Sequence, residues 1–149
     1  MAKLPDFSLA GSDGRTWTRA DLAGRPAVIY LYPKDMTSGC TREACDFRDR
    51  QAAFGKLGVR VFGLSPDSLA SHQKFIAKES LNFVLLADPE KKLIDGLGAW
   101  VEKSMYGRSY MGVERSTFLI DAKGAIAQEW RKVKVPDHAE AVLAAVRLL

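Results

Sequence analysis

Short apolar runs separated by turn residues recur along the chain and predict β-strands. The clearest run, residues 26–32, is apolar at every position, which is typical of a strand covered on both faces of a sheet. The expected strands are residues 26–32, 59–64, 82–86, 117–120 and 125–130, after an N-terminal hairpin of residues 6–9 and 16–18. The pattern therefore predicts a sheet with buried inner strands.

Apolar residues at helical spacing fill most segments between these strands. One helical face runs from Cys40 to Phe54 and predicts a single helix that ends near Gly55. Further helices are expected at residues 68–80, 91–100 and 136–149, and residues 103–114 are expected to form a loop. Because strands alternate with helices, we expect an α/β fold, with a mixed central sheet flanked by helices, in one domain of residues 1–149.

The composition fits a globular protein and excludes several functional classes. The chain has 149 residues, of which 47% are hydrophobic and 27% charged. We find no secretory leader and no apolar run of the ~20 residues that a membrane helix needs, so we expect a cytoplasmic protein that does not enter membranes. The net charge of +4 is scattered, with one dense basic stretch at residues 131–134, so no nucleic-acid partner is expected.

The two cysteines, Cys40 and Cys45, are the residues of greatest chemical interest. They do not form a C-x-x-C pair, and His72 and His138 are distant in sequence, so we expect no metal site. Cys40 follows the strand of residues 26–32, and Thr37 or Ser38 can cap the next helix. Cys40 then lies in the first helical turn, where the helix dipole favours a thiolate nucleophile.

The spacing of the two cysteines restricts how they can react. Five residues of α-helix separate Cα atoms by about 7.5 Å along the axis and turn the side chains about 140° apart. A disulfide needs Cα atoms within about 7 Å and converging side chains. Cys40 and Cys45 can therefore bond only if the start of the helix unwinds. The alternative is that Cys45 is an inert packing residue beside Ala44.

Several separated motifs resemble one family. The pattern Pro33-x-x-x-Thr37-x-x-Cys40 resembles the active site of peroxiredoxins, and a second cysteine at Cys45 resembles their Q-type (bacterioferritin-comigratory-protein) subfamily. Ser38 stands where the subfamily often has proline, which should loosen this loop. The blocks of residues 5–7, 64–67 and 106–121 resemble the same subfamily. The resemblance spans nearly the whole chain and implies a thioredoxin-like fold.

The resemblance also implies a role for each site residue. Cys40 would be the peroxidatic cysteine and Cys45 the resolving cysteine. Thr37 would hydrogen-bond the peroxide and the thiolate, and Arg115 would sustain the thiolate and polarise the peroxide. Pro33 would shield the sulfur from water. Glu43 would belong to the polar network of the active site.

The implied activity is thiol-dependent reduction of hydrogen peroxide and organic hydroperoxides, without a cofactor. Cys40 would become a sulfenic acid and then form a disulfide with Cys45, which thioredoxin, or alternatively glutaredoxin, would reduce. The protein would act as a monomer in antioxidant defence. The aromatic and Met residues of the segment 103–111 either form an apolar collar for organic substrates or, as we expect, pack over the helix.

Three other functions remain open from the sequence. A dithiol–disulfide reductase would share the fold but would prefer a C-x-x-C pair. A redox sensor would turn over slowly and bind a partner protein. A one-cysteine peroxidase would use Cys40 alone and leave Cys45 without a role in the cycle.

Overall fold

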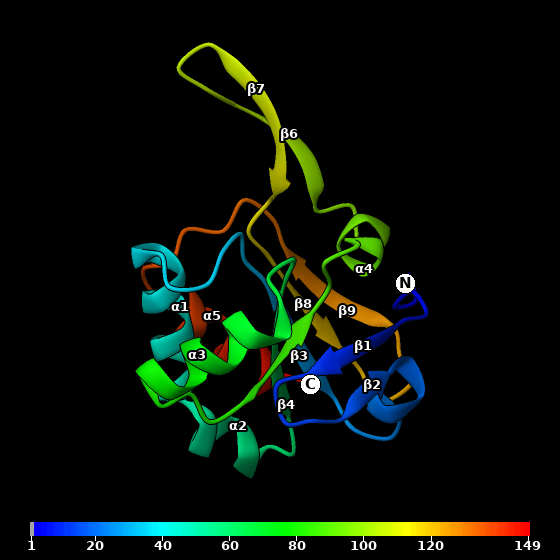
Figure 1. Ribbon diagram of the computed structural model, residues 1–149. Coiled ribbons are helices and arrows are strands. Elements are labelled where there is room, and N and C mark those ends of the chain that lie inside the picture. Colours follow the sequence, from blue (N-terminus) through cyan, green and yellow to red (C-terminus); the bar gives the residue numbers. More distant parts are fainter. Residues whose placement is uncertain (1) are drawn as a thin grey trace.

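The buried strand β3 (Ala27–Leu31) is an inner strand of a seven-stranded sheet in the computed structural model, which describes residues 2–149 (Figure 1). The sheet has the order β2-β1-β5-β4-β3-β8-β9. Its other strands are β1 (Ser8–Gly11), β2 (Thr16–Thr18), β4 (Arg60–Ser65), β5 (Val84–Ala87), β8 (Ser116–Ile120) and β9 (Ile126–Trp130). Strands β3, β4 and β5 are parallel and the remaining pairings are antiparallel, so the predicted mixed sheet and N-terminal hairpin are confirmed.

Helices cover both faces of this sheet, as expected. They are the 3₁₀ helix η1 (Arg19–Leu22) and the α-helices α1 (Ser38–Arg48), α2 (Gln51–Lys56), α3 (Leu69–Glu79), α4 (Lys92–Gly96) and α5 (His138–Val146). Alternate residues of β3 face opposite cores, because successive side chains of a strand point to opposite faces. Val28 and Tyr30 pack with α1, α2, α3 and α5, whereas Ala27, Ile29 and Leu31 pack with α4 and η1.

The single helix expected from Cys40 to Phe54 is wrong, since the chain forms α1 and α2 with a break between them. In a continuous helix the Arg50 N–H would bond the Asp46 carbonyl. Here that N–H donates to the Phe47 carbonyl, and the Arg50 guanidinium donates to Asp46 O over 2.9 Å. Both helices still bury their apolar face, which is why the hydrophobic pattern hides the break.

The prediction of a loop at residues 103–114 is also wrong. Most of this segment belongs to a hairpin of β6 (Trp100–Met105) and β7 (Arg108–Val113), which stands away from the body of the molecule (Figure 1). Tyr106 and Gly107 both have positive φ, as the tightest hairpin turns require. Because both faces of the hairpin are largely exposed, its sequence lacks the apolar alternation of a half-buried strand.

Two helix boundaries also differ from expectation. The helix expected over residues 91–100 is only the short α4, and Trp100 already begins β6. The final helix begins at His138, two residues after Pro136. Among residues 2–149, no helix combines the length and the apolar character needed to cross a membrane.

Candidate active site

Cys40 is the third residue of α1 and lies at the carboxyl end of β3, as the sequence predicts. Thr37 is the N-cap residue, with the extended backbone typical of that position (φ −79°, ψ 157°). The Cys40 side chain belongs to the core between α1 and the sheet, and the residue is only 2% exposed. The sulfur therefore sits in the first helical turn, where backbone N–H groups and the helix dipole favour negative charge.

Arg115 lies between β7 and β8 and reaches back to Cys40. Its Nη2 donates to Cys40 Sγ over 3.3 Å, and its Nη1 donates to Glu43 Oε1 over 2.6 Å. Burial acts to lower the pKa of Arg115, but Glu43 and Cys40 outweigh it and the pKa is raised. A permanent cation is thus fixed against a buried sulfur 75 positions away in the sequence.

Glu43 is the buried partner of this arginine and is 1% exposed. It follows Cys40 by three residues on α1, so both side chains share one helical face. Burial raises the pKa of Glu43 to about 7, with Arg115 opposing the rise and Asp46 adding to it. Within residues 2–149, neither Glu43 Oε2 nor the hydroxyl of nearby Tyr30 has a hydrogen-bond partner. One cation therefore faces two acidic groups, Cys40 and Glu43, in a setting of low polarity.

Thr37 and Pro33 belong to the loop that leads from β3 to α1, and the structure shows no hydrogen bond from Thr37 to the Cys40 sulfur. The Thr37 side chain is exposed, and its hydroxyl donates to the Lys34 carbonyl over 3.0 Å. The Thr37 hydroxyl accepts no hydrogen bond from the backbone at the start of α1, so the side-chain cap that the sequence allows is not formed. Pro33 is half-buried in the same loop, between β3 and α1. Both residues are close in sequence to Cys40, and their roles stay predictions.

Cys45 lies on α1 as well, half-buried, and both cysteines are free thiols. Burial raises the pKa of the Cys45 thiol, Arg48 opposes the rise, and Glu79, Asp49 and Asp46 add to it. Because an unbroken helix carries both cysteines, their five-residue spacing keeps them too far apart to bond. A disulfide requires α1 to open.

One hairpin residue, Lys103, lies near the Cys40–Arg115 contact. Burial and Arg115 lower the pKa of Lys103, which lies near enough to Cys40 and Glu114 to feel their charge. Four large apolar or aromatic side chains of the hairpin are exposed: Met105 55%, Tyr106 97%, Tyr110 44% and Met111 49%. The expectation that these residues pack over the helix is therefore wrong, because the hairpin carries them away from it (Figure 1).

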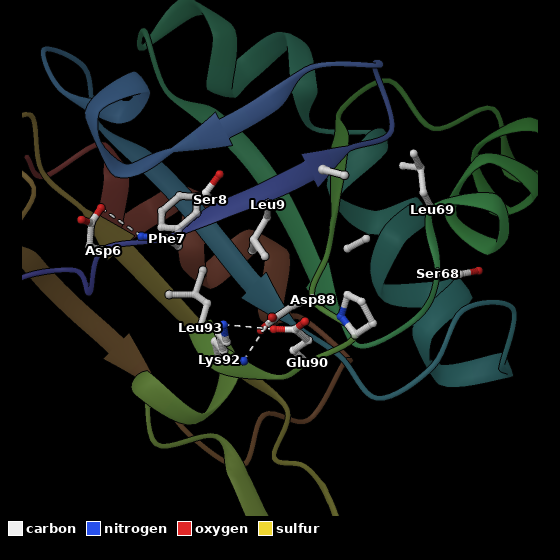
Figure 2. A pocket seen from close by; sticks show the side chains of 13 residues that line it. Asp6, Phe7, Ser8, Leu9, Ser68, Leu69, Asp88, Glu90, Lys92 and Leu93 are labelled. Carbon is white, nitrogen blue, oxygen red and sulfur yellow. Dashed lines mark hydrogen bonds and ion pairs between the residues drawn. The ribbon is translucent and has the colours of Figure 1, made fainter.

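A pocket of about 500 Å³ lies away from these residues. It lies beside β1, α3 and α4, where Phe7, Leu9 and Leu93 line it (Figure 2). None of the six residues predicted for the site lines this pocket. The feature that sets the candidate site apart is therefore the contact between a sulfur and a guanidinium, not this cavity.

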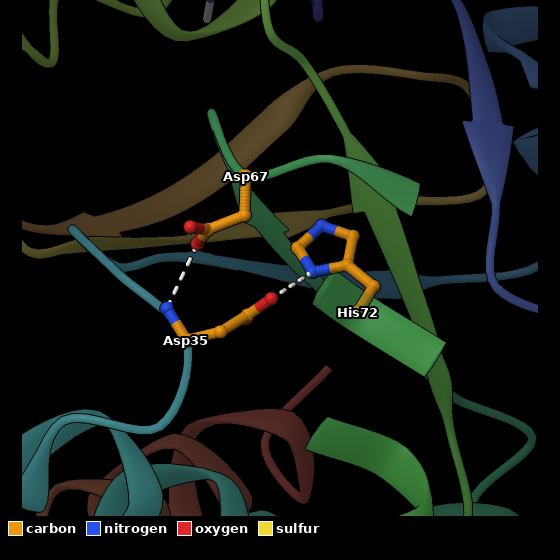
Figure 3. A group of neighbouring side chains, drawn as sticks. All are labelled: Asp35, Asp67 and His72. Carbon is orange, nitrogen blue, oxygen red and sulfur yellow. Dashed lines mark hydrogen bonds and ion pairs between the residues drawn. The ribbon is translucent and has the colours of Figure 1, made fainter. Parts of the chain in front are cut away.

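The sequence motifs assign no function to Asp35 or His72, yet both residues lie next to the candidate site. Asp35 is in the loop that carries Pro33 and Thr37, and Figure 3 shows it bound to His72 of α3 and to Asp67. Their carboxylate and imidazole atoms are close enough together to suit a metal ion, but they already hydrogen-bond one another. Only the position of Asp35 inside the active-site segment could have signalled its involvement.

Comparison with known protein families identifies one match. A family model described as the AhpC/TSA family matches residues 1–129. A protein named peroxiredoxin Bcp from Bacillus subtilis is 52% identical over 136 residues, covering 91% of this chain and 87% of that protein. A peroxiredoxin Bcp from Xanthomonas campestris is 45% identical over 142 residues, covering 95% and 89%.

Solved structures show the same likeness. Peroxiredoxin Q of Xanthomonas campestris superposes with a TM-score of 0.94 at 43% identity, covering 99% of this chain and 96% of that chain. Enterococcus faecalis AhpC, at 20% identity and a TM-score of 0.83, shares the fold. The thioredoxin-like fold expected from the motifs is confirmed.

Proposed function

Since this chain belongs to the AhpC/TSA family, as a thiol-dependent peroxidase of the Bcp/PrxQ type, we propose that Cys40 is its peroxidatic cysteine and Cys45 its resolving cysteine. The observation that carries the proposal is the 3.3 Å contact between Arg115 Nη2 and Cys40 Sγ in the first turn of α1. A nucleophilic cysteine needs to be a thiolate, and both the guanidinium and the helix start favour that form.

In the first step the Cys40 thiolate attacks one oxygen of the peroxide O–O bond. The S–O bond forms as the O–O bond breaks, so the sulfur is oxidised to a sulfenic acid and the peroxide is reduced. The departing oxygen takes a proton and leaves as water or an alcohol. Arg115 stabilises the charge that develops on that oxygen. Glu43 holds Arg115 in this orientation.

Thr37 and Pro33 complete the site in this proposal. A rotation of the Thr37 hydroxyl away from the Lys34 carbonyl would let it donate to a bound peroxide, since a hydroxyl both donates and accepts. Pro33, half-buried in the loop after β3, would shield the sulfur from water.

In the second step the Cys45 thiol condenses with the sulfenic acid, which forms the disulfide and releases water. This step needs the first turns of α1 to unwind. A dithiol reductant then breaks the disulfide by exchange and restores both thiols. Peroxiredoxins generally use thioredoxin-type reductants, and we propose thioredoxin, with glutaredoxin as the alternative to be compared in the assay.

The related Xanthomonas campestris bacterioferritin comigratory protein has been studied for its alkyl peroxide reduction activity. We propose that this chain likewise accepts organic hydroperoxides as well as hydrogen peroxide. All residues assigned here come from one chain, so a monomer suffices for the cycle. Two free thiols suit the reducing conditions of the cytoplasm, where we place the protein.

The test is peroxide consumption by the parent protein, Cys40→Ser and Cys45→Ser, with thioredoxin and its reductase as the electron source. We expect Cys40→Ser to be inactive and Cys45→Ser to react once and then stall. Mass analysis of the oxidised parent should find an intrachain Cys40–Cys45 bond. Full consumption by Cys40→Ser would refute the proposal, and full cycling by Cys45→Ser would favour a one-cysteine mechanism.

A further inference from the structure

A buried polar cluster secures the loop that carries Pro33 and Thr37. Asp35, in the middle of this loop, is 4% exposed and binds Tyr32 at the start of the loop and residues of two other segments. We call its five members the Asp35 anchor; they are Tyr32, Asp35, Asp67, Ser71 and His72. None of these residues belongs to α1, the helix that has to unwind during the cycle.

The carboxylate and the backbone N–H of Asp35 both form hydrogen bonds. Its carboxylate accepts from the Tyr32 hydroxyl over 2.6 Å, from Ser71 Oγ over 2.8 Å and from His72 Nδ1 over 2.7 Å. Its backbone N–H donates to Asp67 Oδ2 over 2.8 Å. Burial acts to raise the pKa of Asp35, but the bonds from His72 and Tyr32 outweigh it, and the pKa is lowered. Asp35 is therefore an ionised acceptor.

His72 ties the loop to α3 and to the neighbouring strand. Its ring is fully buried, with Nδ1 2.7 Å from the Asp35 carboxylate and Nε2 2.9 Å from the Leu86 carbonyl. The Tyr32 hydroxyl also lies 3.5 Å from Nδ1. The loop is thus joined to α3 by a buried hydrogen bond between Asp35 and His72, shown in Figure 3.

The backbone next to Asp35 explains why the loop needs this restraint. Met36 has a φ of 65°, a left-handed conformation that an L-residue adopts at a cost and keeps only when its surroundings hold it. Met36 itself is 40% exposed, so its own side chain supplies little of that restraint. Asp35 on one side and the helix start on the other therefore fix the turn that orients Thr37.

We propose that the buried hydrogen-bonded pair of Asp35 and His72 is a positioning element of the peroxidase, which holds the Thr37 loop in its reactive geometry and keeps it there when α1 unwinds. The proposal rests on the function proposed above. Small displacements of groups that orient a substrate cost rate steeply, by up to about 100-fold for 1 Å. Loss of the pair should therefore slow the attack of Cys40 on peroxide without slowing the later formation of the disulfide.

The test separates the two chemical steps in Asp35→Asn and His72→Gln. Rapid-mixing measurements in a Cys45→Ser background isolate the reaction of Cys40 with hydrogen peroxide, and the same variants with Cys45 present report disulfide formation. We expect the first rate constant to fall about 10-fold in both variants and the second not to fall. If the pair acts as a unit, the double variant should be no slower than the slower single variant.

Asp88→Asn is the matched control. Asp88 is also a buried carboxylate, 1% exposed, and accepts the backbone N–H groups of Lys92 and Ile94 at the start of α4. It should lose comparable thermal stability but react with peroxide at the parent's rate. An equal slowing in Asp88→Asn would reduce the effect to general destabilisation and overturn the proposal, as would parent-like rates in folded Asp35→Asn.

A milder variant and a spectroscopic measurement complete the test. If Asp35→Asn and His72→Gln do not fold, Tyr32→Phe removes one bond to Asp35 and leaves the buried ring in place, and a smaller slowing of the first step alone is expected. Nitrogen NMR of the parent should show a proton on His72 Nε2, the atom that faces the Leu86 carbonyl; a bare Nε2 would refute this arrangement of the pair. If Cys40→Ser destroys peroxide, the proposed function fails. If Cys40→Ser is inactive but Asp35→Asn and His72→Gln react with peroxide at the parent's rate, only the positioning role of the pair fails.

Discussion

The guanidinium of Arg115 binds Cys40 and Glu43 simultaneously, through different nitrogens. The two acidic side chains lie one helical turn apart on α1, and Arg115 is the cation that both contact. Burial raises the pKa of Glu43 to about 7, so the charge beside the Cys40 sulfur depends on whether Glu43 is ionised.

Removing the guanidinium should abolish most of the peroxidase activity. For Arg115→Gln we expect the second-order rate constant with hydrogen peroxide to fall about 100-fold, the scale on which a single charge-stabilising donor acts in an active site. The constant is measured by rapid mixing of the reduced protein. Lys92→Gln, which loses a surface pair with Glu90, is the control and should react normally. A fall of less than threefold in Arg115→Gln would contradict the assigned role.

Glu43 should make the reduced protein less stable as the pH rises. Its pKa of about 7 in the folded protein is above the ordinary value for a carboxyl, so the folded state binds the proton more tightly than the unfolded state. The stabilisation is complete below about pH 4 and is lost as the pH rises through about 7. Between these limits the free energy of unfolding should fall by on the order of 3 kcal/mol.

The measurement is urea unfolding of the parent and of Glu43→Gln across this pH range. Glutamine does not titrate, so the difference between the two curves isolates Glu43 from every other group. The groups that face Glu43, namely Cys40, Asp46, Arg115 and Tyr30, are the same in both proteins. Parallel pH dependences would show that Glu43 does not bind its proton abnormally.

Formation of the disulfide should unfold the start of α1 and leave its surroundings intact. After oxidation by one equivalent of peroxide, we expect faster amide hydrogen exchange over residues 38–48, with β3 and α3 unchanged. The Cys45→Ser protein, oxidised in the same way, cannot form the bond and should keep its protection. Unchanged exchange in the oxidised parent would show that the bond forms without unwinding, against the helical geometry.

Replacing Ser38 by proline should make the unwinding of α1 more difficult. Ser38 is the first residue of α1, where proline fits, and Thr37 before it already has the extended backbone that a following proline requires. We expect Ser38→Pro to raise the free energy of unfolding by about 0.4–1 kcal/mol and to slow disulfide formation. Urea unfolding and rapid mixing test both effects. A destabilised protein would indicate that the Ser38 N–H is needed.

The sequence predicts the mixed sheet and the place of Cys40 in the first turn of a helix, and the physical reason is local. The apolar run at β3 and the helical pattern that follows it place Cys40 beyond a strand end without information from distant residues. The position of Arg115 was available only from a family motif, since its contact with Cys40 spans 75 residues of chain. No periodicity in a sequence reports such a contact.

The wrong predictions also share a cause. A guanidinium that binds a backbone carbonyl lies at the break between α1 and α2, and the hairpin of β6 and β7 turns through two residues with positive φ. In the Asp35 anchor, Tyr32 belongs to an apolar run, and the other four residues look like ordinary polar residues in the sequence. Turn conformations and side-chain hydrogen bonds leave no pattern that hydrophobic spacing can detect.

Because Cys40 and Ala44 are buried in the core on the α1 side of the sheet, oxidation of the two thiols to a disulfide requires part of α1 to unfold. A disulfide usually adds to the stability of a protein, whereas the proposed Cys40–Cys45 disulfide would form only when helical hydrogen bonds and core contacts of α1 are lost. Refolding of α1 then favours the return to two thiols and shifts the bond toward a more oxidising reduction potential. The oxidised protein should accordingly melt at a lower temperature than the reduced one, and a modest dithiol donor should suffice to regenerate it.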